Sequence, residues 1–288
     1  MIFMILPRAS VAAHRIGEVL HTHPTILDGT QASGDPACPG QVEFRNVSFR
    51  YPDAEEYVLK DISFTAKRGE TVAIIGSTGC GKSTVVNLIP RFYDATEGQV
   101  LVDGVDVREY DQRSLRNKIG YVSQKATLFT GTIASNVAYG DNGEAPPSPA
   151  DVQAAVATAQ AEDFVTHLEG GYEGYVAQGG ANLSGGQKQR LSIARALALE
   201  PEILLFDDAF SALDYKTDRV LRSALDQTCQ NTTRIIVAQR IGTIRDADQI
   251  IVLDDGQIAG IGKHQDLMQT CGVYQQIALS QLSKEELA

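Results

Sequence analysis

The chain is short of basic residues, of cysteines and of long apolar runs, and each shortage excludes a class of protein. It carries 25 Lys and Arg against 36 Asp and Glu in 288 residues, a formal net charge of −11. Proteins that hold nucleic acid or dock on anionic lipid present basic surfaces, so both classes are disfavoured. The four cysteines show no CxxC spacing, which indicates a reducing compartment without a zinc site or a disulfide framework. No apolar run reaches the about 20 residues that a membrane-spanning helix needs.

What is present is enough apolar sequence for one sizeable core. Hydrophobic residues make up 43% of the chain, and the length suits one core with an inserted lobe. Short β-branched apolar segments alternate with helical patterns, which predicts an α/β sandwich with a parallel sheet. Strands are expected at 42–47, 71–75, 203–206 and 235–238, hairpins at 100–107 and 250–259, and a helical stretch at 151–170.

The first 40 residues differ in composition from the rest of the chain. A helix is expected at 10–20, and the Gly, Pro, Ser and Asp residues of 28–40 predict a linker, so that the globular domain begins near Gln41. The apolar start, residues 1–6, has neither a basic leader nor a small-residue cleavage site, which makes it a poor signal peptide. Two interpretations of this start stay open: a frayed apolar terminus, or the cut end of a membrane helix.

A phosphate-binding motif follows the apolar segment at 71–75. The pattern G-x-x-x-x-G-K-[ST] is matched by Gly76, Ser77, Thr78, Gly79, Cys80, Gly81, Lys82, Ser83 and Thr84. In this context the glycines let backbone N–H groups surround phosphates, and the helix N-terminus adds partial positive charge. Lys82 is expected to reach the β- and γ-phosphates of a nucleotide, and Ser83 to bind Mg²⁺. The alternative is a glycine turn before an ordinary helix.

A second strand supplies the carboxylate that such a metal ion needs. Four apolar residues at 203–206 precede Asp207. Many buried strands end in Asp, so this pattern is weak alone. Beside a phosphate loop it predicts the second protein ligand of the metal.

One short string decides the family, and it consists of Leu183, Ser184, Gly185, Gly186 and Gln187. This string resembles the signature of ATP-binding cassette (ABC) proteins, and residues 41–288 resemble an ABC nucleotide-binding domain. The resemblance implies an α/β fold: an ABC-type P-loop NTPase core with a parallel sheet, an antiparallel β-subdomain and an inserted α-helical subdomain at about 126–186.

The resemblance also assigns roles to residues outside the phosphate loop. Tyr51 would stack on adenine, although it could instead be a surface turn residue beside Pro52. Gln124 would touch Mg²⁺ and the attacking water, although it could instead be a polar residue at a strand end. With Ser83 and Asp207 it completes the implied metal set, so the implied cofactors are ATP and Mg²⁺.

The signature implies a partner domain. The N–H groups of Ser184, Gly185 and Gly186 open a helix and form an anion site, and the chain contains no second phosphate loop. In the family this site faces the γ-phosphate held by a second nucleotide-binding domain, so that two domains enclose two nucleotides head to tail. The loop around Asp214 would cross between them.

Two further segments resemble exporters. Residues 128–137 resemble the exporter stretch that follows the loop containing Gln124, and residues 7–20 resemble the cytoplasmic end of the last membrane helix. The implied division is 1–40 as helix end and linker, and 41–288 as nucleotide-binding domain. The chain is then a piece of a longer half-transporter, attached to a transmembrane domain at the cytoplasmic face of the cell membrane.

Two of the implied catalytic positions depart from the family. Asp208 stands where hydrolytic sites place Glu, and the missing methylene withdraws the carboxylate by about 1.5 Å. Gln239 stands where the family places the switch His, and an amide cannot become a cation. Gln178 also replaces a Glu that exporters usually carry before the signature. Asp208, Gln239 and Gln124 form the expected catalytic set. The departures at 208 and 239 should both weaken hydrolysis at this chain's own site.

An impaired site beside an intact signature resembles one half of a heterodimeric, bacterial multidrug-type exporter of a drug-like or lipophilic substrate. Such a half would hold ATP in a degenerate site and complete the hydrolytic site of its partner. Two alternatives stay open: a non-hydrolysing ATP-gated clamp that regulates its partner, and an ordinary homodimeric ABC ATPase in which Asp208 suffices. ABC ATPases of DNA repair or translation carry coiled-coil or tandem-cassette architectures, which this acidic chain lacks.

Overall fold

A six-stranded sheet forms the centre of the computed structural model, which describes residues 2–281. Its strands are β3 (Thr71–Gly76), β6 (Ile119–Val122), β9 (Ile203–Asp207), β10 (Thr233–Val237), β11 (Gln249–Asp254) and β12 (Gln257–Gly262). Their order across the sheet is β12–β11–β3–β10–β9–β6. The pairings from β11 to β6 are parallel, and β12 pairs with β11 as the predicted antiparallel hairpin.

Both faces of this sheet are buried, as the continuous apolar strands predicted. Successive side chains of a strand point to opposite faces, so Ala73 and Ile75 join one hydrophobic cluster and Val72 and Ile74 join the other. The first cluster includes residues of α7 (Gly185–Ala198), α8 (Tyr215–Thr228), α9 (Ile241–Ile244), α10 (His264–Thr270) and α11 (Gly272–Gln281). The second includes residues of α2 (Lys82–Leu88), α3 (Gln112–Asn117) and a second sheet.

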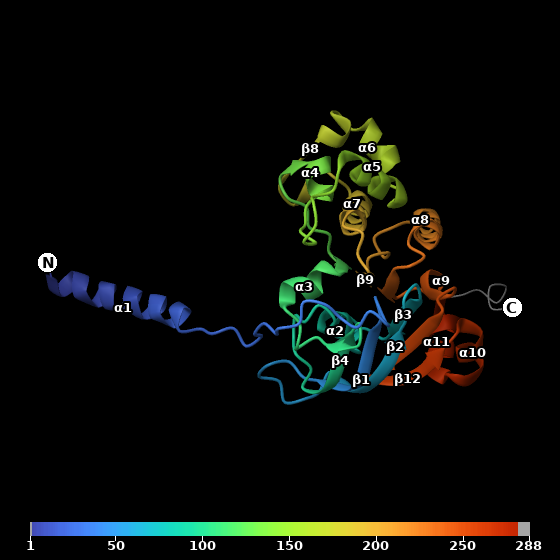
Figure 1. The fold of residues 1–288 in the computed structure, drawn as a ribbon, viewed down its shortest axis with the longest axis horizontal. Helices are drawn as coiled ribbons and strands as arrows, with labels where there is room; N and C mark the ends of the chain where they lie inside the picture. Colours follow the sequence, from blue (N-terminus) through green and yellow to red (C-terminus); the bar gives the residue numbers. More distant parts are fainter. Residues whose placement is uncertain (1, 282–288) are drawn as a thin grey trace.

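The second sheet is antiparallel and lies at the bottom of Figure 1. It consists of β1 (Val42–Phe49), β2 (Leu59–Ala66), β4 (Glu97–Val102) and β5 (Val105–Asp106), in the order β2–β1–β4–β5. Phe44 of β1 stacks on Phe64 of β2, with ring centroids 4.6 Å apart. The turn between β4 and β5 is the predicted Asp103–Gly104 turn.

A mainly helical lobe is inserted between β6 and β9 and lies at the top of Figure 1. It contains β7 (Gly131–Thr132), α4 (Ile133–Val137), α5 (Pro149–Thr158), α6 (Glu162–His167), the 3₁₀ turns η1 (Gly171–Glu173) and η2 (Gln178–Gly180), and β8 (Tyr175–Val176). The helical stretch expected at 151–170 is two helices, because Gln160 takes a φ of 55° between them. The predicted fold class is confirmed: parallel core, antiparallel β-subdomain and helical insertion.

Helix α1 (Ile2–Leu20) projects away from the rest of the molecule (Figure 1). It begins well before the expected residue 10 and contains Pro7. Within residues 2–281, no helix combines the length and the apolar character needed to cross a bilayer.

Residues 28–40, which we call the docked segment, lie against the domain although their composition is that of a linker. Gln31 forms a parallel β-bridge with Tyr110. The backbone N–H of Asp35 donates to the carbonyl of Asp103 at 2.8 Å. The segment is irregular, as Gly and Pro predicted, but its backbone polar groups find partners on the β-subdomain.

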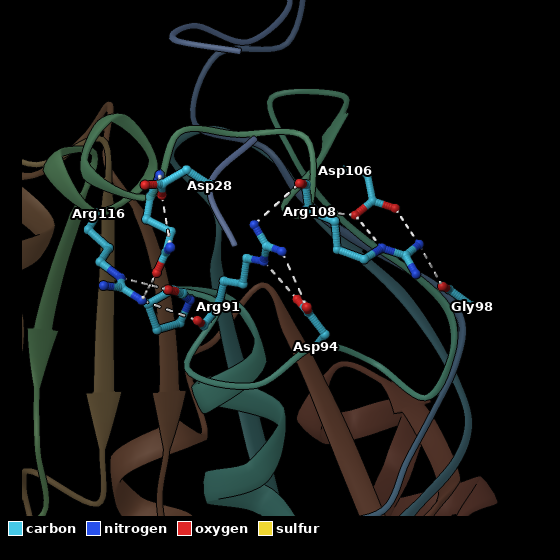
Figure 2. Close-up of polar contacts among 9 residues, drawn as sticks. Asp28, Arg91, Asp94, Gly98, Asp106, Arg108 and Arg116 are labelled. Atoms are coloured by element: carbon cyan, nitrogen blue, oxygen red, sulfur yellow. Dashed lines mark hydrogen bonds and ion pairs between the residues drawn. The ribbon is translucent and has the colours of Figure 1, made fainter. Parts of the chain in front are cut away.

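A chain of hydrogen bonds leads from the docked segment to the loop after α2, as Figure 2 shows. Gln112, the first residue of α3, donates to Asp28 Oδ1 at 2.8 Å and accepts from Arg116 at 2.9 Å. Arg116 in turn donates to the carbonyls of Pro90 at 3.1 Å and Arg91 at 3.2 Å. The segment before the domain is therefore bonded to the chain that follows the phosphate-loop helix.

Candidate nucleotide site

The phosphate-loop motif lies where the sequence predicted it, between β3 and α2. Gly81 caps α2 with a φ of 101°, in the left-handed region, and a Cβ at this position would meet Leu59 Cδ2 at 2.6 Å. Glycine is therefore required here by both conformation and space. The strand, the loop and the helix together form the context in which this motif cradles phosphates.

The ammonium group of Lys82 lies inside the loop. It donates to the carbonyls of Gly76 at 2.9 Å and Ser77 at 2.7 Å, and Cys80 Sγ lies 3.8 Å away. Lys82 is 9% exposed. A buried cation held by neutral carbonyls gains from an anionic partner, because charge-assisted hydrogen bonds are the stronger ones. The loop is therefore suited to a polyphosphate.

Ser83 and Asp207 meet at the end of β9. Ser83 Oγ donates to Asp207 Oδ1 at 2.7 Å, and Tyr121 OH donates to Asp207 Oδ2 at 3.4 Å. Burial, reinforced by the negative charge of Asp208, raises the pKa of Asp207. A hydroxyl and a buried carboxylate at this separation are hard oxygen ligands, and a cation between them would offset the burial of the charge. The pair fits Mg²⁺, which neutralises phosphate charge when it is bound.

Asp208 is the centre of a three-residue cluster. Its Oδ2 accepts from Gln239 Nε2 at 2.7 Å and from Gln124 Nε2 at 3.0 Å. Asp208 is 6% exposed and takes a φ of 50°, a left-handed conformation that Asp tolerates. The three residues expected to be catalytic are thus brought together. Gln124 bonds to this carboxylate and not, within residues 2–281, to the Ser83–Asp207 pair.

Tyr51 lies beside the phosphate-loop helix. Its hydroxyl is 3.0 Å from Thr84 Oγ1. The edges of its ring meet Phe49 and Tyr93 at centroid distances of 4.9 and 5.2 Å. The ring is therefore held by aromatic neighbours next to the loop, and its partial exposure leaves part of the ring open to a ligand.

The signature string opens α7. Ser184 caps this helix: its Oγ accepts from the backbone N–H of Gln187, and the side chain of Gln187 accepts from the backbone N–H of Ser184. A Cβ at Gly185 would meet nothing within 4 Å, whereas one at Gly186 would lie 3.3 Å from the carbonyl of Ala212. The first glycine thus faces open space, and Leu183 is buried in the core behind it.

Asp214 serves as the N-cap of α8. Its carboxylate accepts from the backbone N–H of Thr217 at 3.0 Å and from the Thr217 hydroxyl at 2.7 Å. These hydrogen bonds lower the pKa of Asp214. The residue has a local structural role, whatever it contacts across an interface.

The sequence patterns assigned no role to three residues that the structure places at the site. Tyr121 bonds to Asp207, as described above. Arg240 donates to the carbonyls of Ser211 and Leu213, and Gln281 bonds to the backbone around Gln239. Arg240 adjoins an expected site residue, but no local pattern marks Gln281, which lies 42 positions from Gln239.

The fold and the site together define an ATP-binding domain of the ABC type. The family model "ABC transporter" matches residues 59–211, more than half of the chain. The chain therefore belongs to the ABC transporter family, whose ATPase domains couple ATP hydrolysis to transport.

Relatives at 38–47% identity extend this match over nearly the whole chain. An uncharacterized ABC transporter ATP-binding protein of Mycobacterium tuberculosis (strain ATCC 25618 / H37Rv) is 47% identical over 98% of this chain and 48% of its own length. An ATP-dependent lipid A-core flippase of Pseudomonas putida is 43% identical over 93% of this chain and 44% of its own length. The structure of a bacterial Atm1-family ABC exporter with ATP bound is 38% identical, with a TM-score of 0.89 over 99% of this chain and 49% of that one. The chain thus spans about half the length of these relatives.

Proposed function

We propose that this chain is the ATP-binding motor domain of one half of a heterodimeric exporter. In this proposal it holds ATP and Mg²⁺ in a degenerate site and completes the hydrolytic site of a second nucleotide-binding domain. It acts at the cytoplasmic face of the cell membrane, joined to a transmembrane domain through residues 1–40. The transported substrate is drug-like or lipophilic, which is compatible with the lipid A-core flippase among the relatives.

The observation that carries the proposal is the bond between Asp208 and Gln239. A general base must reach the proton that it accepts, and the side chain of Asp208, held by the amides of Gln239 and Gln124, is one methylene shorter than the usual Glu. The amide at 239 cannot supply the positive charge that an imidazolium would. Loss of one transition-state donor typically costs about 3–4 kcal/mol, so two impaired groups predict a slow site.

The intact signature supports the second part of the proposal. Gly185 faces open space at the start of a 14-residue helix, where N–H groups and the helix dipole favour an anion. The phosphate held by a partner domain is the anion that fits this position. A homodimer would combine two such sites with two slow carboxylates, which argues for a partner with a different sequence.

Purification of the tagged half-transporter from its native membrane tests the pairing. We expect a second, different half-transporter chain with Glu and His at the two positions that correspond to Asp208 and Gln239. Recovery of one chain only would favour the ordinary homodimeric ATPase. Recovery of a different chain in a pair that hydrolyses no ATP would favour the regulatory clamp.

Gly185→Glu tests the signature within the assembled transporter. The new carboxylate would oppose the partner's γ-phosphate, so ATP hydrolysis at the partner's site should be lost. The pair should then keep only the slow hydrolysis at this chain's own site, where ATP still binds to the phosphate loop. Gly272→Glu is the matched control, because a Cβ there also meets nothing within 4 Å and the residue also begins a helix. The proposal would be contradicted if Gly185→Glu kept full activity, whether or not Gly272→Glu lost it.

A further inference from the structure

Residues 238–241, the loop after β10 together with the first residue of α9, make hydrogen bonds to three other parts of the chain, and we call them the switch loop. The side chain of Gln239 bonds to Asp208 at 2.7 Å. The guanidinium group of Arg240 donates to the carbonyls of Ser211 at 3.1 Å and Leu213 at 3.2 Å. These two contacts connect the loop to the end of β9 and to the segment before α8. The third contact comes from α11.

Gln281, at the end of α11, provides that third contact with one side-chain amide. Its Nε2 donates to the carbonyl of Gln239 at 2.7 Å, and its Oε1 accepts from the backbone N–H of Ile241 at 2.9 Å. A carboxamide carries a hydrogen-bond donor and an acceptor in one plane. An ionised carboxylate can only accept, and an ammonium group can only donate. The amide therefore clamps the main chain on both sides of Arg240.

The clamp has a rigid support. Tyr274 and Ala278 of α11 are fully buried, and Gln281 follows them at helical spacings of four and three residues, on the same face of the helix. The Tyr274 hydroxyl lies 2.8 Å from His264 Nδ1 in α10. Gln281 is thus carried by a helix anchored in the core rather than by a loop, which suits a residue that has to hold another group in place.

We propose that Gln281 is a positioning residue for ATP hydrolysis, an inference that rests on the function proposed above. The clamp fixes the backbone of residue 239, and thereby keeps its side-chain amide on Asp208. A displacement of about 1 Å is enough to take a catalytic group out of productive geometry. The end of α11 thus controls the switch residue, Gln239, from outside the phosphate loop.

Gln281→Leu and Gln281→Glu separate the two halves of the clamp. Leu keeps most of the side-chain volume and removes both polar groups. Glu keeps an acceptor for the Ile241 N–H and loses the donor to the Gln239 carbonyl. Gln276→Leu is the matched control, because Gln276 is an exposed glutamine of the same helix.

Two measurements on the assembled transporter read out the clamp. Hydrogen exchange at the Ile241 amide should become about fivefold faster in Gln281→Leu and change little in Gln281→Glu and in the control. Single-turnover hydrolysis is measured in the Gly185→Glu background, so that only this chain's own site contributes. Its rate should fall about fivefold in both Gln281 variants, with the affinity for ATP unchanged.

A double-mutant cycle distinguishes positioning from general support of the fold. In a Gln239→Ala background the Gln281→Leu change should leave the single-turnover rate unaltered, because no side chain remains to be positioned. An equal fall in both backgrounds, or unchanged exchange at Ile241, would overturn the inference. If the assembled transporter hydrolyses no ATP, the proposed function fails, and hydrogen exchange at the Ile241 amide still decides whether Gln281 holds the switch loop.

Discussion

The side-chain amide of Gln239 and the carboxylate of Asp208 share a hydrogen bond of 2.7 Å across 31 positions of sequence. The two residues follow neighbouring parallel strands, β10 and β9, whose carboxyl ends meet at one edge of the sheet. Both departures from the family pattern therefore belong to one local unit. Exchange of either residue changes the surroundings of the other.

The first prediction concerns repair of this unit. Asp208→Glu restores the reach of the carboxylate and Gln239→His restores a group that can become a cation, so the two changes should act on one transition state. Each alone should gain little, and both together should raise turnover at this chain's own site more than the product of the single effects. Single-turnover hydrolysis in the assembled pair is measured for the unmodified chain, the two single variants and the double variant.

The left-handed backbone of residue 208 sets a limit to this repair. Asp tolerates a φ of 50° better than Glu does, so a small loss of thermal stability should accompany Asp208→Glu. Gln239→Asn serves as the control that changes the same position without adding a charge. Turnover at tens per second by the unmodified chain alone, a rate typical of competent enzymes, would refute the impaired site.

The second prediction concerns nucleotide binding. Lys82→Ala removes the ammonium group that lies inside the loop and should abolish most of the affinity for ATP. Tyr51→Ala should cost less, about 1–3 kcal/mol, because stacking on adenine is lost while the phosphate contacts remain. Equilibrium binding of a fluorescent ATP analogue checks both. Equal affinities of the unmodified chain and Lys82→Ala would disprove the site.

The third prediction concerns the docked segment. A Cβ at Gly34 would meet Asp103 Cβ at 2.1 Å and the Tyr110 hydroxyl at 2.5 Å. Gly34→Val should therefore displace the segment and lower the free energy of unfolding by about 1–3 kcal/mol, with little effect on ATP affinity. Ser33→Val is the control, since Ser33 is exposed. Denaturant unfolding measures the difference, and equal stability of the two variants would show that the segment does not pack as described.

The fourth prediction concerns pH. Burial, together with the positive charge of Arg245, lowers the pKa of His264, whose ring bonds to Tyr274. Below the ordinary His pKa of about 6.5 the unfolded chain takes up a proton more readily than the folded one, so stability falls with falling pH until the folded pKa is passed. The melting temperature between about pH 7.5 and about pH 5.5 should therefore decrease less in His264→Gln. Identical slopes would exclude this contribution.

Local patterns were sufficient to predict the parallel core and the phosphate loop. The strand at 71–75 is short, apolar and β-branched, and the motif after it needs only a strand before it and a helix behind it. The order of strands was not predictable in this way. That β3 lies between β10 and β11 depends on pairings with strands more than 150 residues away in sequence.

The contacts that hold the site in place were also beyond the sequence pattern. Asp208 and Gln239 were each expected in the catalytic set from the sequence, yet their mutual hydrogen bond follows from the strand order. The composition of 28–40 indicated an irregular backbone but not its partner: the carboxylate of Asp103 accepts from Gly40 across 63 positions. Side-chain amides such as Gln281 bond wherever the fold places them, so their partners appear only in three dimensions.

Because residues 28–40 are docked on the domain, only a short stretch of chain, from Thr22 to Asp28, connects them to α1. Thr22 still bonds to Glu18 of α1, and Asp28 is already held by Gln112, so six Cα–Cα steps separate the two anchored ends. A fully extended chain of that length reaches about 20 Å. A displacement of α1 beyond this reach has to pull on Asp28, and through Gln112 and Arg116 on the chain just after the phosphate-loop helix. A large displacement of α1 would therefore strain one defined set of hydrogen bonds, which ends at Pro90 and Arg91 in the nucleotide-binding core.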